Sequence, residues 1–322
     1  MIRNTTIGFL SIMFLSGCMK EELPVPAHTL GEARTMTVCM GSAYQDQVWV
    51  DLSTGNIVST NNKTVWDLAF ESADQGWRVM LNGSRLMTAW DLGAVEITQP
   101  SDTIGMHAGR RIDAPSGHPD STAFGDWRAT GNVYLLDLGF NAFGAHLGFR
   151  KVRVNSVDHS NYIFEWAGLD GSGHGSITLQ KDPTRTYTYF SFANGPMVIE
   201  PERGTWDLVF TQYTHQFYVP YLPYIVSGVL VDGSMTQVAR IPNSIFEEIG
   251  PQQAEAFPFE SKRDIIGYDW KYYSFDTGSY TVDQGLCFIV RSHDGLLHKL
   301  RFIDFYSSTG QPGCPTLEVV PL

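Results

Sequence analysis

The sequence predicts a mainly β chain that consists of two tandem antiparallel β-sheet domains with few short helices. Three observations lead to this fold class. Apolar and polar residues alternate with the period of a half-buried strand at 187–192, 270–275 and 299–305. Dipeptides that are typical of tight turns separate such segments. Finally, blocks of similar residues recur about 140 positions apart.

The turn dipeptides are Asn82-Gly83, Asp232-Gly233 and Asp294-Gly295. They accept the positive φ angles of two-residue hairpin turns, so we expect hairpins at these points. Residues 247–256 are compatible with one short helix, which Gly250-Pro251 interrupts. We expect each sheet to be packed on one face and partly open on the other.

The repeat is clearest in two pentapeptides and two decapeptides. Trp66-Asp67-Leu68-Ala69-Phe70 recurs as Trp206-Asp207-Leu208-Val209-Phe210, and 49–58 resembles 189–198 at the same offset of 140. The offset then rises to 150, because Asn82-Gly83-Ser84 matches Asp232-Gly233-Ser234, so about ten residues are added near 214–223. The expected organisation is a β domain at 35–167, a Gly-rich linker at 168–175 and a second β domain at 176–322.

Composition excludes several classes of protein. The 322 residues are 43% hydrophobic and only 17% charged, whereas disordered chains show the opposite balance. A net charge of −12 argues against a nucleic-acid-binding protein, which needs clustered Lys and Arg for phosphate contacts. The sequence contains no P-loop, no dinucleotide fingerprint and no His-Glu-x-x-His motif. We therefore expect a binding protein and not an enzyme.

The N-terminus has the pattern of a targeting segment. Arg3 precedes an apolar run at 7–15 that is too short to span a bilayer. Leu15-Ser16-Gly17-Cys18 resembles the bacterial lipobox, so we expect residues 1–17 to be a lipoprotein signal peptide and Cys18 to carry the lipid. An ordinary signal peptide is the alternative. Residues 18–34 then form a tether. Within it, Lys20-Glu21-Glu22 is either a surface-export signal or simply a charged part of the tether. The expected location is the outer membrane, at the cell surface.

Three cysteines follow Cys18 in the chain. Cys39, Cys287 and Cys314 allow at most one disulfide. We expect Cys39 to be unpaired, and the sequence leaves open whether Cys287 and Cys314 are bonded to each other.

Five side chains are candidate ligands of haem iron. Met106, His107 and His118 lie in a long Gly- and Pro-rich stretch, and His215 lies in the added segment among Phe217, Tyr218, Tyr221 and Tyr224. Met235 follows the Asp232-Gly233 turn. His and Met are axial ligands of haem, and aromatic side chains can line a site for a flat apolar molecule. The alternatives are core filling for the methionines and coverage of a sheet edge for the aromatic segment.

The chain resembles the HmuY-like haem-binding lipoprotein family. The resemblance lies in 35–44 and 48–55, in the two Trp-Asp-Leu blocks, and in 266–271, 288–295, 299–306 and 310–313. It is clearer over 176–322 than over 35–167. It implies an antiparallel β protein of the outer membrane that captures haem and passes it to an outer-membrane transporter, with membrane attachment through Cys18.

The resemblance also implies where the haem ligands lie. The loop with Met106, His107 and His118 corresponds to the family's first axial ligand. The second ligand position corresponds to 274–279, which contains neither His nor Met. Haem would then be five-coordinate or shared between the two copies, or the ligand would differ from haem. The alternative function is a protein-interaction or ligand-binding surface lipoprotein of an uptake complex.

Overall fold

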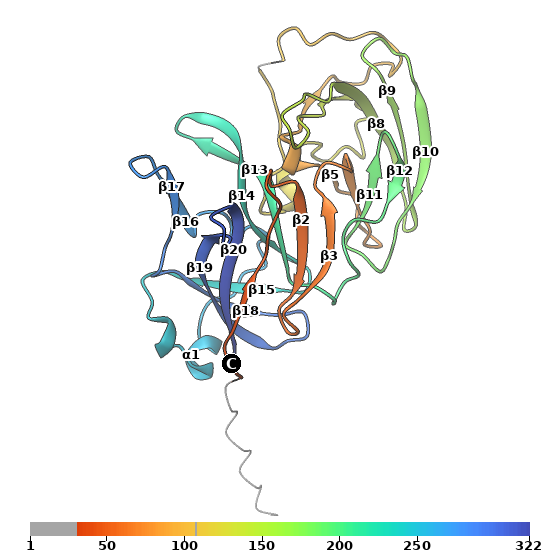
Figure 1. Cartoon of the computed structure of the whole chain (residues 1–322). Helices are drawn as coiled ribbons and strands as arrows, with labels where there is room; N and C mark the ends of the chain where they lie inside the picture. Colours follow the sequence, from red (N-terminus) through yellow and green to blue (C-terminus); the bar gives the residue numbers. More distant parts are fainter. Residues whose placement is uncertain (1–30, 107) are drawn as a thin grey trace, which may run out of the picture.

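The computed structural model describes residues 31–106 and 108–322, so the predicted signal peptide, Cys18, most of the tether and His107 lie outside the described residues. The prediction of a mainly β chain is confirmed: the described residues contain many antiparallel strands and one short α-helix (Figure 1). The elements are β1 (Arg34–Thr37), β2 (Asp46–Asp51), β3 (Asn56–Asn62), β4 (Leu68–Glu71), β5 (Val79–Leu81), β6 (Thr88–Asp91), β7 (Tyr134–Asp137), β8 (Phe149–Val157), β9 (Asn161–Ala167), β10 (Gly175–Gln180), β11 (Tyr187–Ser191), β12 (Gly195–Met197), β13 (Leu208–Tyr218), β14 (Tyr221–Val231), β15 (Gln237–Ile241), α1 (Pro251–Glu255), β16 (Lys271–Ser274), β17 (Ser279–Val282), β18 (Cys287–Arg291), β19 (Leu297–Tyr306) and β20 (Pro312–Pro321).

Four larger sheets form the body of the molecule. Two have five strands, in the orders β1-β20-β19-β18-β15 and β10-β9-β8-β7-β6, and two have four, in the orders β14-β13-β2-β3 and β12-β11-β4-β5. The two four-stranded sheets share a core that contains Trp49, Trp66 and Trp206. Their opposite faces contribute to two further cores, each completed by a five-stranded sheet.

The central strands of the four-stranded sheets, such as β4, β11 and the first half of β13, are therefore buried on both faces, contrary to the partly open face that we expected. Alternate residues of one strand reach different cores: Leu208 and Phe210 belong to one core, and Val209 to the shared one. A strand that is buried on both sides has a continuous apolar run. This burial accounts for the almost unbroken apolar sequence of the two Trp-Asp-Leu blocks.

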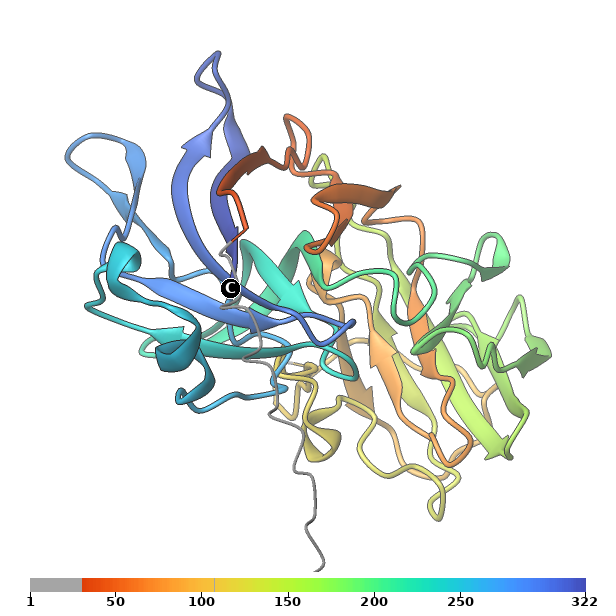
Figure 2. The same cartoon turned by 90° about the horizontal axis from the view of Figure 1, so that it is seen from below.

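Strand pairing crosses the predicted boundary between two successive β domains. β2 from the first range pairs with β13 from the second, and β11 from the second pairs with β4 from the first. β1 also lies beside β20, as Figure 2 shows from below. Each of the three sheets concerned thus combines strands from both ranges. In two of them the hairpin β2–β3 or β11–β12 of one range pairs with the other range, and in the third β1 pairs with β20.

The predicted linker at 168–175 is a turn within one sheet. Gly175 is the register partner of Trp166, so this segment joins β9 to β10 as adjacent antiparallel strands. Of the three predicted hairpin turns, Asp294-Gly295 connects the paired strands β18 and β19. Asn82 instead caps a 3₁₀ turn at Gly83–Arg85, and Asp232 lies between β14 and β15, which belong to different sheets.

The exchanged hairpins are held by matching contacts 140 residues apart. The Asp67 Oδ2 atom accepts a hydrogen bond from the backbone N–H of Phe192 at 2.7 Å, and Asp207 Oδ2 accepts one from Leu52 N–H at 2.9 Å. The ring of Trp66 meets Tyr189 edge to face at 4.9 Å, and Trp206 meets Trp49 in the same way at 4.6 Å. A duplication at an offset of 140 predicts such pairs.

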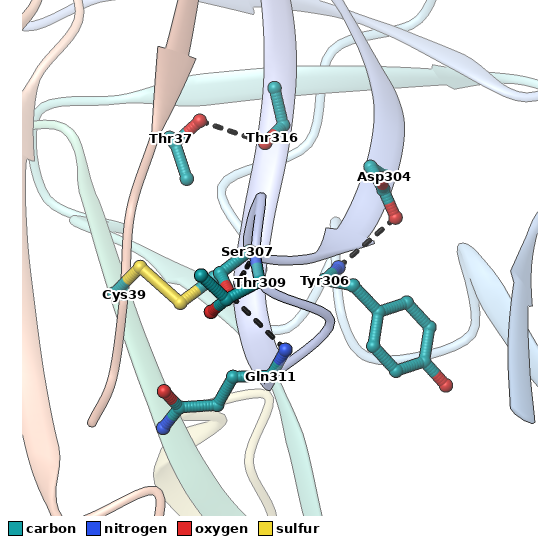
Figure 3. Close-up of a disulfide and its surroundings, with 9 residues drawn as sticks. Thr37, Cys39, Asp304, Tyr306, Ser307, Thr309, Gln311 and Thr316 are labelled. Atoms are coloured by element: carbon teal, nitrogen blue, oxygen red, sulfur yellow. Dashed lines mark hydrogen bonds between the residues drawn. A yellow bond between two sulfur atoms is a disulfide. The ribbon is translucent and has the colours of Figure 1, made fainter. Parts of the chain in front are cut away.

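A disulfide joins the two ends of the described chain. Cys39 is bonded to Cys314 across 275 positions, and Cys287 is a free, buried thiol. The expectation that Cys39 is unpaired is therefore wrong. The reason is the pairing of β1 with β20, which also places Thr37 Oγ1 within 2.8 Å of Thr316 Oγ1 (Figure 3).

Candidate functional site

A two-stranded arm distinguishes the second half of the chain from the first. β13 and β14 pair from Leu208 to Tyr218, but β2 supports β13 only at Leu208–Phe210. The strands next to Phe210 remain buried, as Tyr213 and Thr214 show, and the outer end of the hairpin projects from the body of the molecule (Figure 1). The equivalent strands β4 and β5 are far shorter, so the residues added near 214–223 form this arm.

A cleft of about 480 Å³ lies between this arm and the loop at 110–122. Its volume is in the range of small-molecule sites. The arm contributes His215, Tyr218 and Tyr221, and the loop contributes Arg110 and Arg111. Lys262 adds a third cation, and Asp264 is the one acidic residue among the described residues that line the cleft.

Backbone contacts on both sides fix the loop. Arg111 exchanges two hydrogen bonds of 2.9 Å with Ala89 of β6, and Ser116 accepts one from the Arg263 N–H at 3.1 Å. The partly buried Asp113 carboxylate accepts hydrogen bonds from the backbone N–H groups of Leu81 and Ala123. Burial raises the pKa of Asp113 to about 7 despite these hydrogen bonds, which act in the opposite direction. The wall opposite the arm is thus a fixed part of the fold.

His215 is the one histidine, and no methionine is present, among the described residues that line this cleft. Its ring centroid lies 4.9 Å from those of Phe217 and Tyr268. Neither ring nitrogen forms a hydrogen bond within the part of the chain that the structure describes. Partial burial lowers the pKa of His215 below its usual value, although Asp264 and Asp269 oppose this shift. A neutral imidazole, the form that ligates metals, is therefore favoured.

The other predicted ligands lie elsewhere. Met106 lines an adjacent cleft of about 400 Å³ with Trp90, Phe140 and Phe149, which meets the first at Arg110. His118 is exposed, and its Nδ1 accepts a hydrogen bond from the Asp120 N–H at 3.3 Å. Met235 lies by the turn at Gly204 and lines neither cleft. The structure thus brings only His215 to the arm cleft, and His107 lies outside the described residues.

Sequence reasoning missed the cationic side of the cleft. Arg110 and Arg111 are adjacent in a Gly- and Pro-rich stretch, a signal that would have made them candidate anion contacts. Lys262 and Tyr268 have no such signal, because only tertiary packing brings them to the arm. At the expected second ligand position, the β16–β17 turn presents an exposed Phe275.

Comparison with known protein families gives a match for part of the chain. Residues 43–128 match the model of the HmuY protein family. The chain has a HmuY family segment. The resemblance predicted from the sequence is confirmed there, although this HmuY match falls in the first part of the chain and not in 176–322. No curated protein matches the chain by sequence.

Several solved structures are similar to the chain at low identity. They include apo PinO from Porphyromonas gingivitis (11% identity, 89% of this chain and 96% of that chain covered, TM-score 0.27). The apo HmuY analog of Tannerella forsythia has 10% identity, with 91% and 98% covered and a TM-score of 0.28. A HmuY-like heme binding protein of Bacteroides vulgatus has 12% identity, with 53% and 90% covered and a TM-score of 0.21. Within the described residues, no helix has the length and apolar character needed to cross a membrane.

Proposed function

We propose that the chain is a non-enzymatic haem-binding protein and that the arm cleft holds the haem. The observation that carries this proposal is His215, whose unbonded imidazole lines a cleft with three cationic side chains. The family match over 43–128 and the heme-binding relative from Bacteroides vulgatus support the choice of ligand.

The residues of the cleft fit haem in three respects. His215 supplies an axial ligand for the iron. Arg110, Arg111 and Lys262 can pair with the two propionate carboxylates, for which Arg offers a bidentate fork. Tyr218 and Tyr221 offer aromatic surface to the porphyrin. Because His215 is the one histidine of the described lining, which holds no methionine, we expect it to be the single protein ligand of the iron.

Titration of the protein with haemin, followed at the Soret band, tests this proposal. We expect a shift at micromolar haemin with the spectrum of five-coordinate iron, and a second shift to six-coordinate iron when imidazole is added. His215→Ala should abolish the first shift, whereas His118→Ala, which changes a histidine outside the cleft, should preserve it. Absence of a shift in the unmodified chain, or an identical shift in His215→Ala, would contradict the proposal.

Capture of haem for outer-membrane uptake is the wider role that we propose. It requires lipidation of Cys18, which places the cleft at the cell surface. Metabolic labelling with a radioactive fatty acid should mark the unmodified chain and not Cys18→Ser. Equal labelling of the two forms would contradict the lipid anchor.

A second candidate function is binding of another protein, such as an outer-membrane transporter, through the tip of the arm. Tyr218 is 77% exposed, Val219 94% and Tyr221 69%, a concentration of apolar surface that is unusual at a hairpin end. Pull-down from detergent-solubilised membranes without haem should recover a partner that Tyr218→Ser/Tyr221→Ser loses. Recovery of the same proteins by the variant would exclude the arm as the contact.

A further inference from the structure

A second cleft, of about 210 Å³, lies on the other side of the 110–122 loop, where the two halves of the chain meet. Ser116 lines both clefts, but His215 and the arm are absent from the second. Its charged lining side chains are Arg78, Glu200, Asp232 and Arg263. The volume equals roughly seven water molecules at the density of the liquid, so a small polar molecule fits.

Arg263 reaches this cleft between two glycines. A Cβ atom on Gly117 would lie 2.8 Å from the Arg263 Cδ atom, and a Cβ atom on Gly233 would lie 3.2 Å from Arg263 Cγ. The absence of side chains at both positions therefore leaves space for the Arg263 stem. The guanidinium forms no hydrogen bond and no ion pair with any residue that the structure describes; it lies 5.8 Å from the ring centroid of Tyr187. Its five N–H donors are available to a ligand.

Asp232 supplies a free acceptor in the same cleft. The residue is 2% exposed, and its Oδ1 atom accepts hydrogen bonds from the N–H and Oγ of Ser234. Its buried Oδ2 atom has no hydrogen-bond partner in the part of the chain that the structure describes. The corresponding residue of the first half is Asn82, whose Nδ2 donates to the carbonyl oxygens of Lys63 at 2.7 Å and Trp66 at 2.8 Å. The local turn needs only the acceptor that Asn also provides, so the extra carboxylate oxygen is not required for folding.

The remaining acid of the cleft is already bonded. Glu200 accepts hydrogen bonds from the Tyr187 N–H at 2.5 Å and from the Tyr189 hydroxyl at 3.3 Å. Burial raises the pKa of Glu200 to about 7, so a large part of it is neutral at pH 7. The principal unpaired charges that face the cleft are therefore the Arg263 guanidinium and the Asp232 carboxylate.

We propose that this cleft binds a small zwitterion of the α-amino acid class, with its carboxylate on Arg263 and its ammonium on Asp232 Oδ2. A simple anion would satisfy Arg263 but would face the Asp232 carboxylate. A simple cation would satisfy Asp232 but would face Arg263. A molecule with both charges a few ångströms apart compensates each buried group with an opposite charge.

Thermal denaturation of the haem-free protein with each of the free amino acids at millimolar concentration tests the proposal, with acetate and methylammonium as probes that carry one charge each. A bound amino acid raises the midpoint in proportion to the logarithm of its concentration. We expect at least one amino acid to raise the midpoint and both single-charge probes to leave it unchanged. Isothermal titration calorimetry then gives the affinity of the best amino acid.

Two variants locate the site. Asp232→Asn introduces the residue that occurs at the same position of the first half, and Arg263→Lys keeps the charge but removes the fork. Each should weaken amino-acid binding about tenfold to a hundredfold, as expected for loss of a charge-assisted hydrogen bond. His215→Ala should bind the amino acid as the unmodified chain does. The proposal is overturned if no amino acid raises the midpoint, if acetate or methylammonium does so equally, or if the two variants bind as tightly as the unmodified chain. In those cases the cleft holds only water or a simple ion.

Discussion

Loss of the Cys39–Cys314 disulfide is expected to lower the thermal midpoint of the chain by several degrees. The bond closes a loop of 275 positions and thereby lowers the conformational entropy of the unfolded chain. The chain-entropy relation assigns a loop of this length about 5.6 kcal/mol of stabilisation, slightly above the range of about 0–5 kcal/mol that is typically measured. We therefore take about 5 kcal/mol as the upper limit.

The midpoint shift follows from the size of the folded part. Residues 31–322 number 322 − 30 = 292. An unfolding entropy of about 2.1 cal/mol/K per residue amounts to about 0.6 kcal/mol/K for this length, so about 5 kcal/mol corresponds to a decrease of about 8 °C. The β1–β20 pairing remains in the variant, because it depends on backbone hydrogen bonds and not on the sulfur atoms.

Circular dichroism melts of Cys39→Ser/Cys314→Ser measure this decrease. Cys287→Ala is the matched control, because it removes the buried free thiol and leaves the disulfide intact. The control should lose about 2 °C or less, which corresponds to about 1 kcal/mol for a small cavity. A double variant that melts within 2 °C of the unmodified chain would refute the reasoning, since the long loop would then contribute no constraint.

Three further predictions concern the exchanged hairpins, the buried acids and the cationic wall. Asp207→Ala leaves the N–H groups of Leu52 and His293 without their acceptor, so urea denaturation should give a loss of about 2–6 kcal/mol; a loss below 1 kcal/mol would contradict the role of Asp207. Burial raises the folded-state pKa of Glu200 from 4.5 to about 7, so its contribution to stability is present below pH 4.5 and is lost as the pH rises to about 7. The free energy of unfolding should therefore fall over this pH window, and Glu200→Gln should make the fall smaller; an unchanged slope in the variant would refute the assignment. Arg110→Ala/Arg111→Ala should weaken haemin binding about threefold to tenfold, less at high salt because both side chains are exposed; equal affinity at low salt would remove them from the site.

Sequence patterns predicted the strands and the repeat spacing but not the hairpin exchange. The residues of 49–58 and 189–198 match whether each hairpin pairs with its own half or with the other, because the side chains need the same buried environment in both cases. The pairing of Cys39 with Cys314 depends on the same exchange of chain ends. A contact between residues that are 275 positions apart leaves no local pattern in the sequence.

The candidate sites were predictable to different extents. His215 was identifiable, because it lies in an aromatic segment that the first half lacks. Met106 and His118 have the correct chemistry and lie in the predicted loop, yet packing directs them to an adjacent cleft and to a helix cap. Arg263 has no sequence signal, since its role depends on two glycines that are far apart in the chain, Gly117 and Gly233.

The most direct test of the central claim is a haemin titration of the soluble chain without Cys18, compared with that of His215→Ala. The account predicts a Soret shift at one haemin per chain, with a five-coordinate spectrum that becomes six-coordinate on addition of imidazole, and no shift in the variant. A six-coordinate spectrum before imidazole is added, or a shift that persists in His215→Ala, would contradict a site with His215 as the single protein ligand.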